Sequence, residues 1–360
     1  MDRPQMDRRQ LLQAGIVSGI SSLWAPRCMS QEDREELEPV SLGLVAYCCN
    51  LQRQQSRQEG HPDLFQPSNF LRHCRHLGAG GMQIHLGSLD RNEAEKLHRQ
   101  SRDYDFFIEA IVSLPKTDQD KGRFTQELKT AAAVGANVAR TVAFPGRRYE
   151  RFQSMDDYRA HEKLALEQLS RALPICQSTG VALALENHKD QRIEERVGLL
   201  KKFDSEWLGA CVDTGNSIAL LEDPLETAQT LAPFAKSVHL KDQAVQLSRD
   251  GFLLGDIPLG QGSVDLRSIV RVLKEKVPDL QFCLELITRP PLLVPCLDSS
   301  YWHTLRDIPA HQLSDMLQWV REHHTAPLQD PTKLRLSEKA QLETKNVLQS
   351  LAYARDVLSL

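Results

Sequence analysis

Eight short apolar runs alternate with helical patterns along this chain, and this repeat limits its fold most. Each run has the length of a strand, and the stretches between them repeat apolar residues at helical spacing. One such stretch covers 155–178 and stops at Gly180, just before the next run. Strand and helix repeated about eight times predict an α/β fold, the (β/α)8 or TIM barrel. The predicted strands are 41–48, 81–86, 106–112, 137–144, 181–187, 208–213, 236–242 and 281–287.

Length and composition agree with one barrel and a short addition. A chain of 360 residues with 41% hydrophobic residues can bury the core of a single barrel, which we place at 39–325. Beyond the eighth strand, patterns at 311–323 and 334–358 predict two further helices, and 326–360 is a C-terminal helical extension. The formal net charge is -4, so no excess of basic residues favours nucleic acid as a partner.

The N-terminal segment has the pattern of an export signal. Arg8 and Arg9 precede a mildly apolar stretch, Leu11 to Ala25, and the segment RRQLLQ resembles a twin-arginine signal. We therefore predict a signal over 1–30 and export to a bacterial periplasm, or a cytoplasmic protein if this prediction fails. The apolar stretch is too short for a stable transmembrane span unless the signal stays uncleaved.

Four of the predicted strands end in a residue that can bind a metal. The segments are ALENHKD with Glu186, CVDTGNS with Asp213, SVHLKDQ with His239 and FCLELIT with Glu285. Because the C-terminal ends of parallel barrel strands meet on one face, we expect these four side chains to converge there. Three carboxylates and an imidazole favour a divalent cation such as Mn²⁺ or Mg²⁺.

Each of these residues also has an ordinary structural interpretation. A glutamate at a strand end often faces solvent, Asp213 before Thr214 and Gly215 is typical of a turn or a helix cap, and a lone histidine is often a core residue. The combination favours metal binding over the structural interpretation, because four such groups converging from strands five to eight would repel one another or stay poorly solvated without a cation.

An insertion follows the seventh predicted strand. The segment from Gln243 to Gln261 contains Asp250–Gly251 between apolar residues, which predicts a β-hairpin. We expect this hairpin to close over the active face, with Phe252 and Leu253 near the metal. The alternative is a surface hairpin packed on a neighbouring loop or subunit.

The segments ALENH, VDTGN, VHLKD, PLGQGSVD and LELI resemble the sugar phosphate isomerase/epimerase family, the xylose isomerase-like TIM barrels. The resemblance spans Ser41 to Ile287 and is strongest from residue 181 onward. It implies that the four residues above bind one divalent ion and that Glu186 and Glu285 also move the proton. From the donor set we expect this ion to be Mn²⁺, with Mg²⁺, Co²⁺ or Zn²⁺ as alternatives. The resemblance further implies that His188 and Lys241 face the substrate or support the site.

Two positions depart from the family pattern. Asn216 stands where sugar epimerases of this family usually have a histidine, so an amide replaces an imidazole beside the substrate. Gln261 replaces the acidic residue of the usual Gly-Glu-Gly loop. We also expect Arg140, at the end of strand four, to orient substrate hydroxyls, although a salt bridge is the structural alternative. No glycine-rich phosphate cradle is evident, which favours a free sugar or polyol over a sugar phosphate.

These inferences predict a metal-dependent sugar isomerase or epimerase. Proton removal beside a carbonyl would give an enediolate, with Glu186 and Glu285 as acid and base on a small sugar substrate. A keto-sugar or keto-inositol lyase or dehydratase uses the same first step. Less favoured are an endonuclease IV-like phosphodiesterase, which needs more histidines and a basic face, and a non-catalytic sugar-binding protein. The sequence is compatible with a homo-oligomer.

Overall fold

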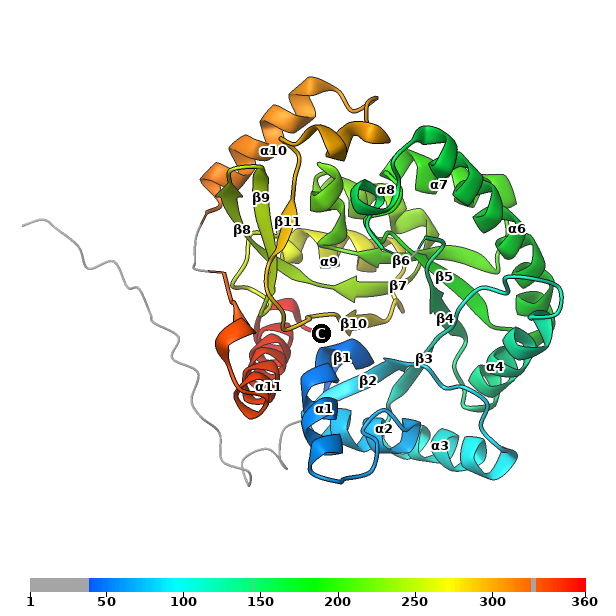
Figure 1. Cartoon of the computed structure of the whole chain (residues 1–360). Helices are drawn as coiled ribbons and strands as arrows, with labels where there is room; N and C mark the ends of the chain where they lie inside the picture. Colours follow the sequence, from blue (N-terminus) through cyan, green and yellow to red (C-terminus); the bar gives the residue numbers. More distant parts are fainter. Residues whose placement is uncertain (1–38, 145, 325–327) are drawn as a thin grey trace, which may run out of the picture.

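Eight parallel strands close into a barrel in the computed structural model, which describes residues 39–144, 146–324 and 328–360 (Figure 1). The order around the barrel is β1-β10-β7-β6-β5-β4-β3-β2, so the predicted TIM barrel is confirmed. The predicted export signal lies outside the described residues. The barrel strands are β1 Val40–Val45, β2 Ala79–Ile84, β3 Phe107–Ile111, β4 Val138–Thr141, β5 Ala182–Glu186, β6 Leu208–Asp213, β7 Ala235–Leu240 and β10 Phe282–Leu284.

Most of the strands are shorter than the apolar runs that predicted them, because the backbone leaves the barrel wall where the side chains turn polar. The eighth run, predicted over 281–287, pairs as a strand only over Phe282–Leu284. The backbone N–H of Glu285 still donates to the carbonyl oxygen of Leu240 at 3.1 Å. Glu285 therefore stands at the rim of the barrel and remains fixed to the neighbouring strand.

The long helix α6 begins and ends at residues that satisfy its free backbone groups. Ser154 accepts the N–H of Asp157 at the start of α6, and Gly180 ends that helix in the left-handed conformation, with φ 72°. The α-helices are α1 Asn50–Gln58, α2 Pro67–His76, α3 Arg91–Asp103, α4 Lys121–Ala133, α5 Arg148–Arg151, α6 Met155–Thr179, α7 Ile193–Phe203, α8 Pro224–Leu231, α9 Leu266–Lys276, α10 Ala310–Glu322 and α11 Leu336–Tyr353.

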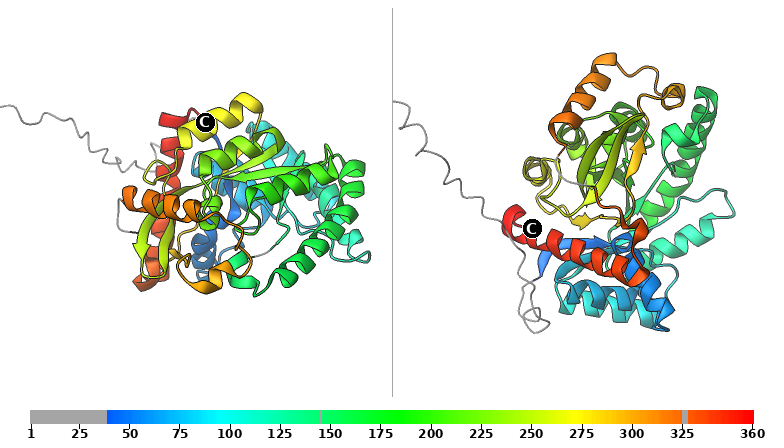
Figure 2. Two further views of the ribbon diagram at one scale, coloured as in Figure 1. Left: turned by 90° about the horizontal axis from the view of Figure 1, so that it is seen from above. Right: turned by 60° about the vertical axis from the view of Figure 1, so that its left-hand side comes forward.

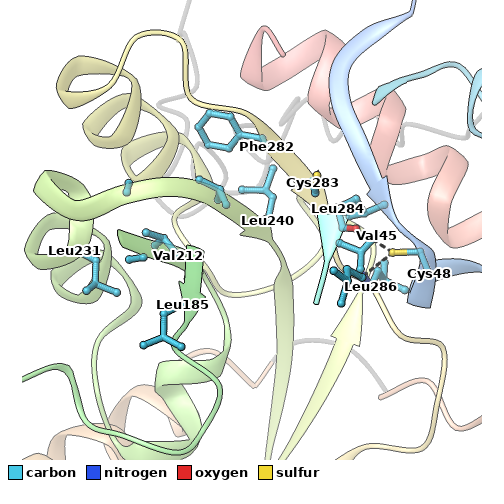
Figure 3. Packing of buried hydrophobic residues seen from close by; sticks show 14 of the residues in the cluster. Val45, Cys48, Leu185, Val212, Leu231, Leu240, Phe282, Cys283, Leu284 and Leu286 are labelled. Carbon is cyan, nitrogen blue, oxygen red and sulfur yellow. Dashed lines mark hydrogen bonds between the residues drawn. The ribbon is translucent and has the colours of Figure 1, made fainter. Parts of the chain in front are cut away.

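Close packing between strands and helices fills the layer around the barrel wall (Figure 3). Strands β1 and β2 carry glycines where the Phe107 ring packs, because a Cβ on Gly81 would lie 2.1 Å from that ring and one on Gly43 would lie 2.5 Å from it. The inward residues of the later strands are small or polar, which leaves room for charged side chains above them.

A second, three-stranded sheet extends from the rim of the barrel. It consists of β8 Asp242–Ser248, β9 Gly251–Ile257 and β11 Leu292–Val294, in the order β11-β9-β8. The predicted hairpin is therefore confirmed, and the sheet packs against α10 (Figures 1 and 2). The third strand was not predicted, because Leu292–Val294 is short and follows two prolines.

The C-terminal helix α11 packs along α1, so the last α-helix of the described residues lies beside the first (Figure 2). The buried Glu343 carboxylate of α11 accepts the backbone N–H groups of Leu51 and Gln52 in the first turn of α1, at 2.9 to 3.1 Å. The predicted C-terminal helices are thus confirmed as part of the barrel's outer layer. None of the helices in the described residues combines the length and apolarity that a bilayer span requires.

A hollow of about 1150 Å³ lies at the N-terminal ends of the barrel strands, where Val40, Gly80 and Val138 are among its lining residues. It contains none of the four predicted metal ligands. Because barrel enzymes place their chemistry at the opposite end, we assign this hollow no catalytic role.

Candidate metal centre

The four predicted metal ligands converge at the C-terminal end of the barrel. Glu186 and Asp213 are the last residues of β5 and β6, His239 lies near the end of β7, and Glu285 directly follows β10. One ligand atom from each of the four lies within 4.8 Å of the others, and all four residues are buried. The structure therefore brings together the set that the strand spacing predicted.

The imidazole of His239 points its Nδ1 atom at the three carboxylates. Nδ1 lies 3.5 Å from Glu186 Oε2, 3.5 Å from Glu285 Oε2 and 3.9 Å from Asp213 Oδ2. The other ring nitrogen, Nε2, lies 2.8 Å from Gln83 Oε1. Because an amide oxygen only accepts, Nε2 carries the hydrogen and the lone pair of Nδ1 faces the carboxylates.

A hydrogen-bonded layer below the ligands fixes this arrangement. Gln83 Nε2 donates to Glu109 Oε2 at 2.8 Å, and the Ser237 hydroxyl donates to the same oxygen at 2.6 Å. The orientation of the Gln83 amide is set by these contacts, and through it the tautomer of His239. Outer partners of this kind orient metal-ligating histidines.

The chemistry of the donor set fits a divalent cation. His239 Nδ1 is buried and has no hydrogen-bond partner among the described residues, whereas buried polar atoms are nearly always partnered. Three buried carboxylates around one imidazole lone pair repel one another, and a cation satisfies all four groups at once. Oxygen-rich sites with one imidazole suit Mn²⁺ and Mg²⁺, with Zn²⁺ and Co²⁺ as competitors.

Arg140, Lys241 and Asn216, all predicted to contact substrate, lie against the ligand set. Arg140 Nε donates to Glu186 Oε2 at 2.6 Å, and its Nη2 contacts the same oxygen. Lys241 Nζ lies 3.0 Å from Asp213 Oδ2 and 2.7 Å from Glu285 Oε2. Asn216 Nδ2 donates to Glu186 Oε1 at 3.0 Å. Whether these groups also contact substrate stays a prediction.

These positive charges decide the ionisation of the two glutamates. Burial by itself raises the pKa of Glu186, but the charge of Arg140 outweighs it and lowers that pKa to about 2. Burial is likewise outweighed at Glu285, where the charge of Lys241 holds the pKa well below its usual range. Both carboxylates are therefore ionised at neutral pH.

Side chains near the strand ends hold β5, β6 and β7 in register. The Asn187 amide donates to the carbonyl oxygen of Asp213 and accepts its N–H, at 2.9 and 2.8 Å. The Thr214 hydroxyl makes the same double contact with the backbone of Lys241, at 2.8 Å each. Oδ1 of Asp213 accepts two backbone N–H groups, from Gly215 and Asn216. Its other oxygen, Oδ2, is thereby turned towards the remaining ligands.

A buried thiol fixes the backbone on both sides of Glu285. Cys48 Sγ donates to the carbonyl oxygen of Leu284 at 3.0 Å, and the N–H of Leu286 lies 3.1 Å from the same sulfur (Figure 3). Cys48 lies in the turn after β1 and is fully buried. It therefore ties the first barrel strand to the eighth at the position of the ligand.

The loop from Asn187 to Arg192, called the β5 loop below, carries groups that the sequence did not single out. Lys189 is 5% exposed and donates from Nζ to Asn216 Oδ1. Next to it, Asp190 forms a buried ion pair with Arg196 of α7 at 2.9 Å. The neighbouring His188, predicted to face substrate, is half-buried, and its Nδ1 has no partner among the described residues.

The hairpin formed by β8 and β9, called the β7 hairpin below, differs from its prediction in one respect. Only its base adjoins the site, where Gln243 packs on Gly215 and donates to Asp256 at 2.6 Å. Phe252 pairs with Leu247, about 14 Å along the strand from Gln243. The expectation that Phe252 and Leu253 lie near the metal was wrong, because the register places them towards the hairpin tip, where β9 pairs with β11.

The mouth of the barrel is lined by a pair of residues that follow β1 and β2. The Tyr47 hydroxyl lies 3.1 Å from His85 Nε2, and both side chains are accessible to solvent in part. Tyr47 thus lies at the rim, where it can meet a ligand entering the barrel.

Comparisons with known proteins agree with this fold. A family model described as xylose isomerase-like TIM barrel matches residues 71–323. The uncharacterised protein YihM of Escherichia coli K12 is 23% identical over 239 residues, which cover 66% of this chain and 68% of YihM. A 3-oxo-isoapionate decarboxylase of Pectobacterium atrosepticum is 27% identical over 203 residues, covering 55% of this chain and 69% of that enzyme.

Among solved structures, an L-ribulose 3-epimerase superposes with a TM-score of 0.55 at 13% identity, covering 88% of this chain and 94% of the epimerase. At this identity the likeness concerns the fold alone.

Proposed function

Because the chain belongs to the xylose isomerase-like TIM barrel family, we propose that it is a divalent-metal-dependent enzyme that forms an enediolate from a small carbohydrate. The observation that carries the proposal is the buried set of three carboxylates facing the unpartnered Nδ1 of His239. A non-catalytic sugar-binding protein needs no such set. We further propose that the outcome is isomerisation or epimerisation and that the ion is Mn²⁺.

When bound, the cation supplies Lewis-acid polarisation of adjacent substrate oxygens, which acidifies the C–H bond beside a carbonyl. Residues of the protein then remove and return the proton. Both oxygens of Glu186 are engaged, one by Asn216 and the other by Arg140. Glu285 is bound at Oε2 by Lys241 and is 4% exposed, against 0% for Glu186. We therefore assign Glu285 as the base that takes the proton, while the electron pair of the C–H bond passes into the enediolate.

Arg140 and Lys241 lie where negative charge develops and stabilise it. Return of the proton to the opposite face of the same carbon gives an epimer, and return to the neighbouring carbon gives an isomer. Glu186 is the second carboxylate that can deliver it.

A lyase is the second candidate, and the relationship to the decarboxylase favours it. Its first intermediate is the same enediolate or enolate. A dehydratase removes the same proton and then expels a leaving group, whereas a decarboxylase reaches the enolate by losing CO₂ and then takes up a proton, so the candidates share the site and differ in substrate.

Solvent exchange tests the shared step. The metal-loaded protein is incubated in D₂O with a panel of ketoses, keto-sugars and sugar acids, and deuterium incorporation is measured by mass spectrometry. We expect exchange at one carbon of one substrate class, and a loss of about 10³-fold in Glu285→Gln. Glu275→Gln, an exposed glutamate on α9, is the matched control. Metal-loaded protein that exchanges no proton and cleaves no member of the panel would refute the proposal.

A further inference from the structure

Two buried lysines approach the candidate metal centre from neighbouring loops. Lys189, in the β5 loop, donates to Asn216 Oδ1, and Lys241 Nζ lies 3.5 Å from the same oxygen. The two residues are 5% and 2% exposed. Two ammonium groups thus meet at one amide oxygen, beside the ligand carboxylates.

The two lysines differ in their partners. Lys241 pairs with two ligand carboxylates. Lys189 forms no ion pair within the described part of the chain, and its one hydrogen bond goes to a neutral amide. A buried ammonium without an anion is unfavourable. Burial, followed by the charge of Lys241, lowers the pKa of Lys189 to about 8, in keeping with a cation that lacks its counter-ion.

The β5 loop is built to hold Lys189 in this position. Its backbone has a φ of 51°, a left-handed conformation that is unfavourable for a lysine. The Lys189 carbonyl oxygen accepts the N–H of Arg148 at 3.0 Å. On its other side, Asp190 accepts the N–H of His188 at 3.0 Å and pairs with the buried Arg196. Such backbone strain persists only where surrounding contacts enforce it.

The charges around the ligands favour an anionic substrate. The three ligand carboxylates equal in number the three buried cations around them, Arg140, Lys189 and Lys241, so a divalent cation would leave an excess of two positive charges. We propose that Lys189 and Lys241 bind a carboxylate of the substrate, which is therefore a sugar acid or its oxo derivative. This inference deepens the proposed function and rests on it.

The position of Lys189 and Lys241 determines how far the substrate carboxylate lies from the carbons that react. Asn216 contacts Lys189 through its oxygen and the ligand Glu186 through its nitrogen. One side chain therefore separates the carboxylate subsite from the metal ligands. A carboxylate bound there lies within a few carbon atoms of the oxygens that the cation would polarise.

A phosphate fits this place less well. Buried phosphates are usually held by free backbone N–H groups at a helix N-terminus. Helix α7 begins shortly after Lys189, and two of the N–H groups at its start are already used. The N–H of Arg192 donates to Glu195 Oε2 at 2.8 Å, and that of Ile193 donates to Glu222 Oε1 at 2.9 Å.

Ligand binding tests the inference without relying on turnover. The probes are aldonates of four to six carbons, each compared with its alditol and with D-glucose 6-phosphate, titrated calorimetrically into metal-loaded protein. We expect at least one aldonate to bind tenfold or more tightly than its alditol. Lys189→Met should abolish this preference without lowering Tm, and Lys189→Arg should keep part of it. Lys96→Met, on the exposed face of α3, is the matched control and should bind as the wild type does.

The outcomes separate this inference from the proposed function. Equal binding of every aldonate and its alditol, or no aldonate binding at all, would overturn the carboxylate subsite. Tighter binding of glucose 6-phosphate than of any aldonate would replace the carboxylate by a phosphate. An unchanged preference in Lys189→Met would also contradict it. Deuterium exchange into neutral ketoses alone would leave the proposed function standing and this inference refuted.

Discussion

The β5 loop and the β7 hairpin both follow strands that carry a metal ligand, but they serve the site differently. The short loop places Asn187, Lys189 and Asp190 in buried contacts at or beside the ligands. The longer hairpin contributes only its base, where Gln243 packs on Gly215, and its tip packs with β11 and α10. The length of an insertion is thus a poor guide to its role, and buried charges with few partners are a better one.

Breaking the ion pair between Asp190 and Arg196, which supports the β5 loop, should have the largest effect. Asp190→Asn leaves the Arg196 guanidinium, which is 0% exposed, without its carboxylate. We expect a loss of about 3–5 kcal/mol in the free energy of unfolding, measured with denaturant. Activity should fall as well, because Lys189 loses its support.

The double variant Asp190→Asn with Arg196→Met is the control, since it removes both charges and should recover part of the stability. A single variant within about 1 kcal/mol of wild type would show that the pair does not hold the loop.

Truncation in the β7 hairpin should separate stability from activity. Phe252 is fully buried, so Phe252→Ala should cost about 3–4 kcal/mol in the free energy of unfolding. Its partner Leu247 is 41% exposed, and Leu247→Ala should change stability by less than about 0.5 kcal/mol. We expect kcat/KM of folded Phe252→Ala to stay within about threefold of wild type. A large drop with metal content intact would instead make the hairpin tip part of the site.

The hydrogen-bonded layer below the ligands, which includes Glu109, should make the stability of the protein depend on pH. Burial raises the pKa of Glu109 to about 7, against hydrogen bonds from Ser237 and Gln83 that lower it. The folded protein therefore holds a proton that the unfolded chain releases, and this contribution to stability is lost as pH rises from about 4.5 to 7. Glu109→Gln should match wild type near pH 4.5 and exceed it at pH 8 by up to about 3 kcal/mol. A difference in Tm that does not change between pH 5 and 8 would contradict this.

The fold and the ligand set were predictable because both depend on local patterns. Apolar runs of strand length predicted the barrel, and the strand-end position of Glu186 and Asp213 predicted their convergence. The same reasoning predicted the hairpin, because a turn signal separates its strands. The same turn signal already places Phe252 near the hairpin tip. Its pairing with β11 was not predictable, since that strand is too short to recognise.

The supporting residues depend on contacts between segments far apart in the sequence. Gln83, Glu109 and Ser237 come from three strands, and nothing in their local sequence marks them as partners. Lys189 was overlooked because a lysine in a polar loop normally faces solvent. Its left-handed backbone and the Asp190 ion pair, which turn it inward, are visible only in the structure.

Metal binding tests the central claim most directly. Protein purified without chelator, then treated with EDTA and titrated with Mn²⁺ in a calorimeter, should bind about one equivalent per chain. His239→Ala should weaken binding by about 100-fold or more, because it removes the one nitrogen ligand, whereas Glu275→Gln should bind as wild type does. One equivalent of Mn²⁺ that depends on His239 is the result we predict. A wild-type protein that binds no divalent ion, or that retains three zinc ions per chain, would contradict the account.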